Sequence, residues 1–236
     1  MNFKTLNING ETILIATIFG ENYPLETVKY HKLVMQDYYN LPVNYISAPF
    51  PAINHGQAMD EVIRQSINTI KPDYYLFIDN DAIFLKKGCI ELIYSIVSNK
   101  ITVFGHAWQS NDRKGPNGSF QHAYAAPATL CFSTELYKKI DSPICAHMTH
   151  IIPEMGRSDS GEEITYRAKE LGFIVSLIYP SHSVLQNTDL DNGCRYGMGN
   201  TYGNNLMYHA SQQCNPESKR YFVDKCKEVL SGKYEE

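Results

Sequence analysis

Two carboxylates, Asp79 and Asp81, stand one residue apart directly after the apolar run Tyr74–Ile78. Such a run is typical of a buried strand, so both carboxylates are expected at a strand end, where the backbone can direct them at one cation. Hard ions such as Mg2+ or Mn2+ prefer oxygen ligands and complete their shell with phosphate oxygens and water. Asp and Asn are also favoured in strand-end turns, so the motif alone leaves a structural role open. The spacing indicates a metal site that could neutralise a diphosphate.

The elements around this motif alternate between strand and helix. Apolar runs rich in β-branched residues predict strands, and apolar residues repeating every three to four positions predict helices. Strands are expected at Thr12–Phe19, Val43–Ile46, Tyr74–Ile78, Ile101–Phe104, Ala128–Phe132 and Phe173–Ile178. Helices are expected at Pro24–Val34, His55–Ile70, Gly88–Ser98, Thr134–Ile140, Gly161–Leu171 and Pro216–Leu230. This order predicts one α/β domain over residues 1–236, with a mostly parallel central sheet flanked by helices and ligands at strand carboxyl ends.

Two segments lack any periodicity and are expected to be loops. Gly105–Gln121 is polar with several turn signals and has room to form a lid. Asn187–Asn205 is rich in Gly and Asn and offers little apolar surface to offset its conformational entropy. We therefore expect this second segment to be flexible until a ligand orders it.

Composition narrows the class of protein. The chain has 236 residues, 43% of them hydrophobic. Its 25 acidic and 21 basic residues give a formal charge of -4. This charge gives no support for a nucleic-acid partner, although it does not exclude one. The apolar run Ile13–Phe19 is too short to cross a bilayer and has no signal-peptide cleavage site. A cytoplasmic protein without a transmembrane segment is expected. Six cysteines without a Cys-x-x-Cys pair indicate reduced thiols.

In their order along the chain, these pieces resemble the glycosyltransferases of the GT-A fold. Ile13–Phe19 is similar to the strand that ends at the nucleotide pocket, and Phe77–Ala82 to the family's Asp-x-Asp metal motif. Gly161–Arg167, followed by Leu171–Phe173, is similar to the acidic helix and glycine that line the acceptor side, and its paired Glu looks closest to the hydroxyproline N-acetylglucosaminyltransferase branch. The resemblance covers most of residues 12–186.

The resemblance implies a single Rossmann-like GT-A domain and a transferase activity. Residues 12–105 would form the nucleotide-sugar and metal half, and residues 106–236 the acceptor half, with a flexible C-terminal loop and a terminal helix. A hexose or N-acetylhexosamine would pass from a UDP- or GDP-sugar to a hydroxyl acceptor of unknown type, with Mn2+ or Mg2+ required. Inversion and retention of configuration both stay open.

The resemblance also implies residues for the donor and the metal. Thr17, Phe19, His55 and Asn80 would contact the nucleotide-sugar. Asp79 and Asp81 would bind the metal, and the third ligand in this family is often a histidine that follows the last strand. We favour His209, because a flexible segment before it could deliver it to the site, over the alternative His182.

On the acceptor side, Glu163 or Glu162 would deprotonate the acceptor hydroxyl or position it. Glu at a helix start also interacts favourably with the helix dipole and needs no catalytic role. The family's usual pair is Glu-Asp, and Asp159 also lies nearby. Trp108 and Tyr124 flank the first polar segment and could stack on a sugar, although core packing is the more common role for a single Trp.

Two other classes of protein also fit the pattern. A nucleotidyltransferase or pyrophosphorylase also uses strand-end carboxylates, but it normally has a glycine-rich, basic phosphate loop after the first strand, which Gly20–Tyr23 is not. A non-catalytic sugar-binding domain could keep the fold without turnover. The intact Asp79 and Asp81 pair weighs against that reading.

Overall fold

The computed structural model describes residues 2–20, 23–49, 54–109, 123–146, 159–189, 195–211 and 215–235, with only the backbone described for 186–189 and 195. The helices are α1 Leu25–Lys32, which continues into the π-helix η1 Leu33–Tyr38, α2 His55–Thr69, α3 Cys89–Val97, α4 Thr134–Lys139, α5 Glu162–Glu170 and α6 Pro216–Leu230. The strands are β1 Leu6–Ile8, β2 Glu11–Gly20, β3 Asn44–Ala48, β4 Tyr74–Phe77, β5 Ala82–Phe84, β6 Thr102–Gln109, β7 Ala123–Ser133, β8 Ile174–Ile178, β9 Pro180–Asp189, β10 Arg195–Tyr202 and β11 Met207–Ala210.

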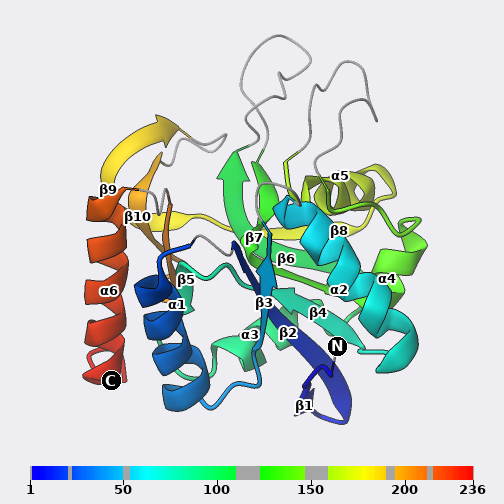
Figure 1. The fold of residues 1–236 in the computed structure, drawn as a ribbon. Helices are drawn as coiled ribbons and strands as arrows, with labels where there is room; N and C mark the ends of the chain where they lie inside the picture. The colour runs from blue at the N-terminus through cyan, green and yellow to red at the C-terminus, as the bar shows by residue number, and fades with distance from the viewer. Residues whose placement is uncertain are drawn as a thin grey trace.

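The larger sheet is mixed, which corrects the prediction of a mostly parallel one. In the described part of the chain its order is β1-β2-β4-β7-β6-β8, and β3 also pairs with β2 (Figure 1). The pairs β2–β3, β2–β4 and β6–β8 are parallel, whereas β1–β2, β4–β7 and β6–β7 are antiparallel. Apolar runs predict strands without their direction, and β7 pairs antiparallel with both β4 and β6. The expected division at residue 105 falls inside β6.

The smaller sheet has the order β5-β11-β10-β9 and is antiparallel throughout. It corrects the prediction of a free loop over Asn187–Asn205: among the described residues of that segment, 187–189 belong to β9, 195–202 belong to β10, and 203–205 lie in the turn that leads to β11. The glycines serve close packing: a Cβ on Gly197 would lie 2.2 Å from the Val184 carbonyl oxygen. The Asn200 side chain accepts a hydrogen bond from the Gly197 N–H (2.7 Å) and donates one to its carbonyl (2.9 Å). Close packing and side-chain hydrogen bonding therefore account for glycine and asparagine there, and disorder is not needed.

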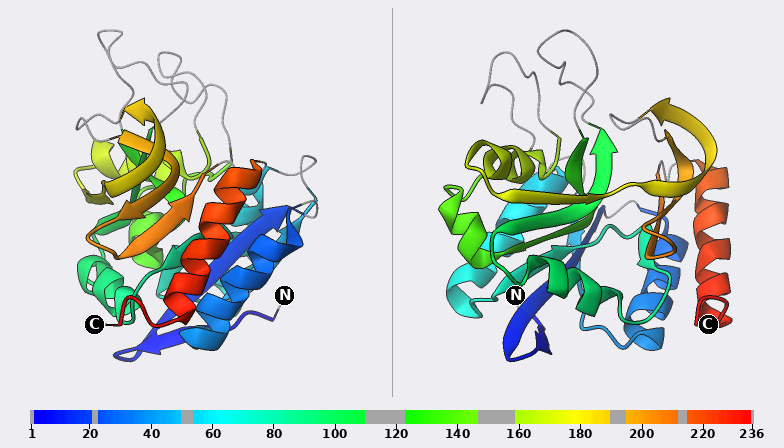
Figure 2. Two further views of the ribbon diagram at one scale, coloured as in Figure 1. Left: turned by 90° about the vertical axis from the view of Figure 1, so that its left-hand side faces the viewer. Right: turned by 180° about the vertical axis from the view of Figure 1, so that it is seen from behind.

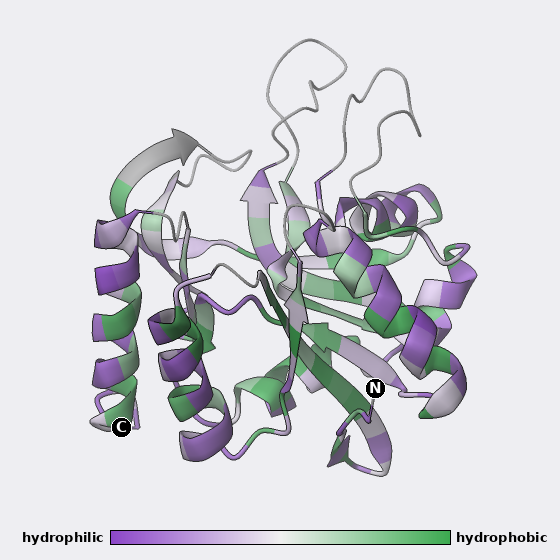
Figure 3. Ribbon diagram, in the orientation of Figure 1, coloured by the Kyte–Doolittle hydropathy of each residue, from purple (hydrophilic) through white to green (hydrophobic). Residues whose placement is uncertain are grey.

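Helices cover both faces of the larger sheet. Alternate residues of β2 face opposite sides: Ile13 and Ile15 belong to one apolar cluster, Leu14 and Ala16 to the other. The first cluster includes η1, α3, α6 and the strands β5 and β11; the second includes α2, α4 and α5. Figure 2 shows α1 and α6 side by side on the first side, and Figure 3 shows apolar central strands between helices with hydrophilic outer surfaces.

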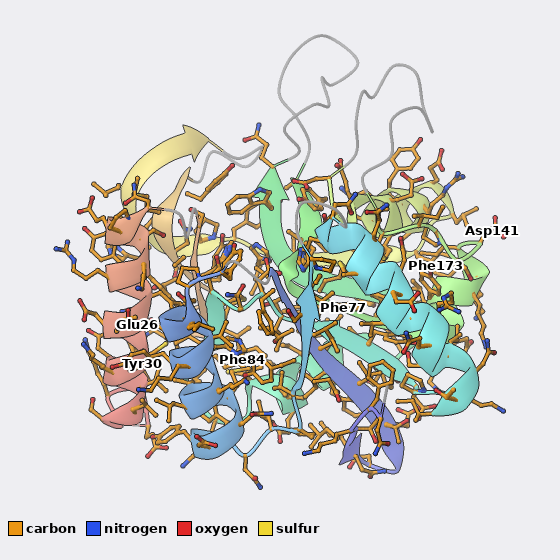
Figure 4. The ribbon with its side chains drawn as sticks, viewed as in Figure 1. Glu26, Tyr30, Phe77, Phe84, Asp141 and Phe173 are labelled. Carbon is orange, nitrogen blue, oxygen red and sulfur yellow. The ribbon has the colours of Figure 1, made fainter. Side chains whose placement is uncertain are left out.

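Individual side chains follow this division. Phe84 and Phe77 are 2% exposed and lie inside the first and second cluster respectively (Figure 4). On the outside, Glu26 of α1 forms an ion pair with Lys219 of α6 (2.7 Å). The described cysteines Cys89, Cys131, Cys145 and Cys226 are buried and free, and no helix in the described ranges has the length and apolar character needed to cross a membrane.

Candidate metal centre and its two cavities

The Asp79–Asp81 turn joins β4 of the larger sheet to β5 of the smaller one. The Ala82 N–H donates to the Asp79 carbonyl (3.0 Å), which closes the turn. The Ala210 N–H donates to the Asp81 carbonyl (2.9 Å), so β11 is attached directly to the motif. The backbone that carries both carboxylates is therefore fixed from two sides.

His209 reaches this turn from β11. It lies opposite Ala82 in the pairing with β5, and its Nε2 is 3.6 Å from Asp81 Oδ1. One ligand atom each from Asp79, Asp81 and His209 lies within 4.8 Å of the others. Two carboxylates and an imidazole in that arrangement could hold a metal ion. His182, the alternative ligand, is exposed on β9 and lies outside this group.

Burial sets the electrostatics of the group. Burial raises the pKa of Asp79, and Asp159 raises it further, whereas His55, with Nε2 3.3 Å from Asp79 Oδ1, lowers it. Burial, and then the neighbouring charge of Asp79, raise the pKa of Asp81 well above its usual range. Burial lowers the pKa of His209 to about 3, so its imidazole is neutral at pH 7 and has a lone pair to offer. Two like charges beside a neutral imidazole form a site that a divalent cation would stabilise.

A cavity of about 310 Å³ opens on one side of the metal group. Its walls include His106 and Trp108 of β6, Tyr124 of β7, and Asp159. The two aromatic residues face the cavity from paired strands, since Trp108 lies opposite Tyr124. The prediction of a loop over Gly105–Gln121 is wrong for residues 105–109, which belong to β6, and its remaining residues lie outside the described ones.

A bulge between β6 and β7 shapes the cavity floor. The pairing moves from Gly105–Leu130 to His106–Ala126, so Pro127, Ala128 and Thr129 are left out of the ladder. A Cβ on Gly105 would lie 2.6 Å from Ala125 Cβ, which explains the glycine. The bulge sets Pro127 and Ala128 along the cavity wall, beside His106.

A smaller cavity of about 130 Å³ also borders Asp79 and Asp81 and shares His55 with the larger one. Three of the predicted donor-binding residues, Phe19, His55 and Asn80, line it, and within the described part of the chain the buried Asn80 Nδ2 has no hydrogen-bond partner. The capping box between Asn54 and Gln57 fixes the first turn of α2 and so places His55 against Asp79. Thr17 is fully buried and lines neither cavity.

The paired glutamates of α5 are buried and line neither cavity. Glu162 accepts a hydrogen bond from the Asp159 N–H (2.8 Å), and Glu163 contacts Arg167 Nε (3.1 Å). Besides Asp79 and Asp81, the described carboxylate that lines the larger cavity is Asp159, and it accepts hydrogen bonds from the Tyr124 hydroxyl (2.9 Å) and the Ser160 N–H (2.7 Å). Sequence reasoning noted Asp159 but gave priority to the pair that follows it.

His106 is a second cavity residue of this kind: the sequence places it beside the polar segment with Trp108 and Tyr124, but no role was predicted for it. It stands two positions before Trp108 on one strand, and strand residues two apart share a face. The alternation of β6 was thus a usable signal, once the strand was known to continue past Phe104. Both ring nitrogens of His106 are buried without a hydrogen-bond partner.

Comparisons with known proteins add little to this picture. No family model and no curated protein matches the chain. Among solved structures, "Crystal Structure of A197 from STIV" matches with a TM-score of 0.45 and 9% identity, over 85% of this chain and 94% of that one. A glycosyltransferase involved in the glycosylation of the major capsid of PBCV-1 matches with a TM-score of 0.33 and 17% identity, over 53% of this chain and 64% of that one. At these TM-scores neither likeness carries an argument, and what stands is a mixed α/β protein with an Asp-Asp-His group that could bind a metal.

Proposed function

We propose that this chain is a metal-dependent glycosyltransferase of the GT-A type, which transfers a sugar from a nucleoside-diphosphate donor to a hydroxyl acceptor. One observation carries the proposal: Asp79, Asp81 and His209 form one group, and its two aspartates line two separate cavities. A transferase of this kind needs a cation between a donor pocket and an acceptor pocket.

The metal would be held by Asp79, Asp81 and His209. When bound, Mn2+ or Mg2+ would neutralise the charge that develops on the departing diphosphate. Burial raises the pKa of both aspartates, which shows that their negative charges are poorly stabilised by the protein. A bound cation would supply the missing positive charge. A neutral nitrogen ligand is compatible with Mn2+ as well as Mg2+, and slightly favours Mn2+.

We assign the smaller cavity to the nucleotide side of the donor. Phe19 offers an apolar surface there, and the unpartnered Asn80 Nδ2 offers a donor for a polar edge or a phosphate oxygen. The smaller cavity, at about 130 Å³, is too small for a whole nucleotide-sugar. The donor would therefore extend past the metal into the larger cavity. Thr17 is buried and lines neither cavity, so we give it no contact with the donor.

We assign the larger cavity to the sugar and the acceptor, with Asp159 in place of Glu162 or Glu163 as the catalytic base. Tyr124 and Ser160 fix the Asp159 carboxylate by hydrogen bonds, and Trp108 offers an aromatic face. Asp159 would take the proton of the acceptor hydroxyl as the acceptor oxygen bonds to the anomeric carbon and the bond from that carbon to the diphosphate breaks. Direct displacement of this kind inverts the anomeric configuration.

A panel of UDP- and GDP-sugars, incubated with Mn2+ and then with EDTA, tests the proposal. Slow donor hydrolysis or transfer that requires the metal and is lost in Asp81→Asn is expected. Metal-dependent binding of UDP or GDP without any turnover would identify a sugar-nucleotide-binding domain instead. Release of pyrophosphate from a nucleoside triphosphate in the presence of a sugar phosphate would identify a nucleotidyltransferase.

A further inference from the structure

A cluster of buried polar atoms without partners lies directly behind His209. His209 Nδ1, both ring nitrogens of His106 and the hydroxyl of Tyr202 are buried, and none has a hydrogen-bond partner among the described residues. The Ala126 backbone also acts on the His106 ring as a weak hydrogen-bonding group that raises its pKa, but this contact lies outside the geometry of a full hydrogen bond. A buried polar group left unsatisfied is destabilising, so several together need an explanation.

The three side chains are in contact, and they come from three different strands. The His106 ring centre on β6 is 5.1 Å from that of His209 on β11 and 5.2 Å from that of Tyr202 on β10, with near-perpendicular planes. A single bridging water, or a small rotation of one ring, is enough to join atoms at these separations. The bulge at Gly105 and His106 sets this part of β6 in place.

If His209, His106 and Tyr202 form a chain of hydrogen bonds, the number of protons on the two rings fixes which atom donates in each bond. His209 turns Nε2 toward Asp81, so Nε2 must carry the lone pair if His209 binds a metal. The single proton of the neutral ring then sits on Nδ1, which needs an acceptor. One nitrogen of a neutral His106 can accept it, and the other nitrogen, which then carries a proton, can donate to the Tyr202 oxygen. Every unpartnered ring nitrogen in the cluster and the Tyr202 oxygen are satisfied by this one arrangement.

We propose that His106 is a positioning residue that holds His209 in the tautomer with its proton on Nδ1, and that Tyr202 in turn orients His106. The inference rests on the proposed metal site, because the Nε2 lone pair matters only if a cation lies between His209 and the aspartates. Partners of this kind around metal-bound histidines typically change metal affinity by about 10- to 100-fold when they are removed.

The first measurement needs no variant. Two-bond 15N–1H correlation spectra of the metal-free protein in EDTA show which nitrogen of each histidine carries the proton, and His209→Gln identifies the His209 signals. An imidazole free in water prefers the proton on Nε2, so the expected Nδ1 tautomer of His209 is the opposite of the default. A His209 proton on Nε2 in the folded chain overturns the proposal.

The second measurement compares variants by calorimetry with Mn2+. His106→Phe fills the space without an acceptor and is expected to bind Mn2+ about 10- to 100-fold more weakly, with His209 shifted toward the Nε2 tautomer. His106→Gln restores an acceptor and is expected to recover most of both properties. His182→Ala removes an exposed histidine and serves as the matched control, with wild-type affinity expected.

The outcomes separate this inference from the proposed function. Wild-type protein that binds no Mn2+ would refute the metal site, while the tautomer of His209 would still report on its coupling to His106. Wild-type affinity and an unchanged tautomer in folded His106→Phe would refute the role of His106 and leave the metal site standing. If His106→Phe does not fold, His106→Gln and the wild-type spectrum decide the question.

Discussion

Removing one carboxylate of the metal group should abolish the stabilisation of the fold by a cation. Asp81→Asn keeps the size of the side chain and removes its charge. In the wild type, Mn2+ at 100 times its dissociation constant stabilises the fold by about 2.7 kcal/mol. A chain of this length shifts its melting temperature by about 2 to 4 °C per kcal/mol, so a rise of about 5 to 10 °C is expected. The variant should lose this rise.

The same substitution should have a different effect without metal. Burial raises the pKa of Asp81, so the folded state binds that proton more tightly than the unfolded state. The resulting stability is complete below the unfolded pKa, about 4, and is lost as pH rises through the folded pKa. In EDTA the wild type should therefore be more stable at mildly acidic pH than at neutral pH, as far as Asp81 is concerned. At pH 7, Asp81→Asn should melt at or above the wild-type temperature.

Differential scanning fluorimetry between pH 5 and 7.5, with EDTA or Mn2+, measures both effects. Asp141→Asn is the matched control, since it makes the same chemical change at an exposed position that lines neither cavity. It should leave both the melting temperature and the Mn2+ response unchanged. A full Mn2+ response in Asp81→Asn, or a metal-free variant that melts clearly below the wild type at pH 7, would refute this account of the site.

Three further outcomes follow from the geometry. In an initial-rate assay, Asp159→Asn should lower the transfer rate about 100-fold or more, whereas Glu163→Gln should keep it within a few-fold of the wild type. An equal loss of rate in both variants would contradict the assignment of Asp159 as the base. His209→Ala should weaken Mn2+ binding by about tenfold or more in calorimetry, and retained affinity would exclude it as a ligand. Gly105→Ala should destabilise the fold by about 1 to 3 kcal/mol in urea unfolding, because its Cβ would overlap Ala125; an unchanged midpoint would contradict the close packing of the bulge.

Local patterns predicted the elements that carry the metal motif. The strand expected at Thr12–Phe19 is β2, Glu11–Gly20, and the helix expected from His55 is α2, which ends at Thr69, before Pro72. These segments are apolar or periodic over a short stretch, so nearby residues contain the whole signal. The direction of β7 depends on partners distant in sequence, and no periodicity records it.

The β9–β10 pair shows a different reason for failure. Its glycines and asparagines resemble a flexible loop in composition, yet Gly197 is required by a neighbouring carbonyl oxygen, and Asn200 bonds to the backbone of Gly197. Both causes lie in tertiary packing. The preference for His209 over His182 now rests on its place in β11 opposite Ala82, and not on delivery by a flexible segment.

The sequence predicted residues of the candidate site only where a chemically suitable residue type coincides with a local structural pattern. Asp79 and Asp81 follow a buried strand directly, and their spacing alone suggested a cation. His106 and Asp159 give no such signal, because a lone histidine in a strand and an aspartate before a helix are common in proteins without any site. Their roles are inferred from their neighbours in the fold. The Tyr124 hydroxyl orients Asp159, and His106 lies beside a ring nitrogen of His209 that has no partner among the described residues. Such residues are found by asking which buried polar atoms lack partners, a property that only the folded chain has.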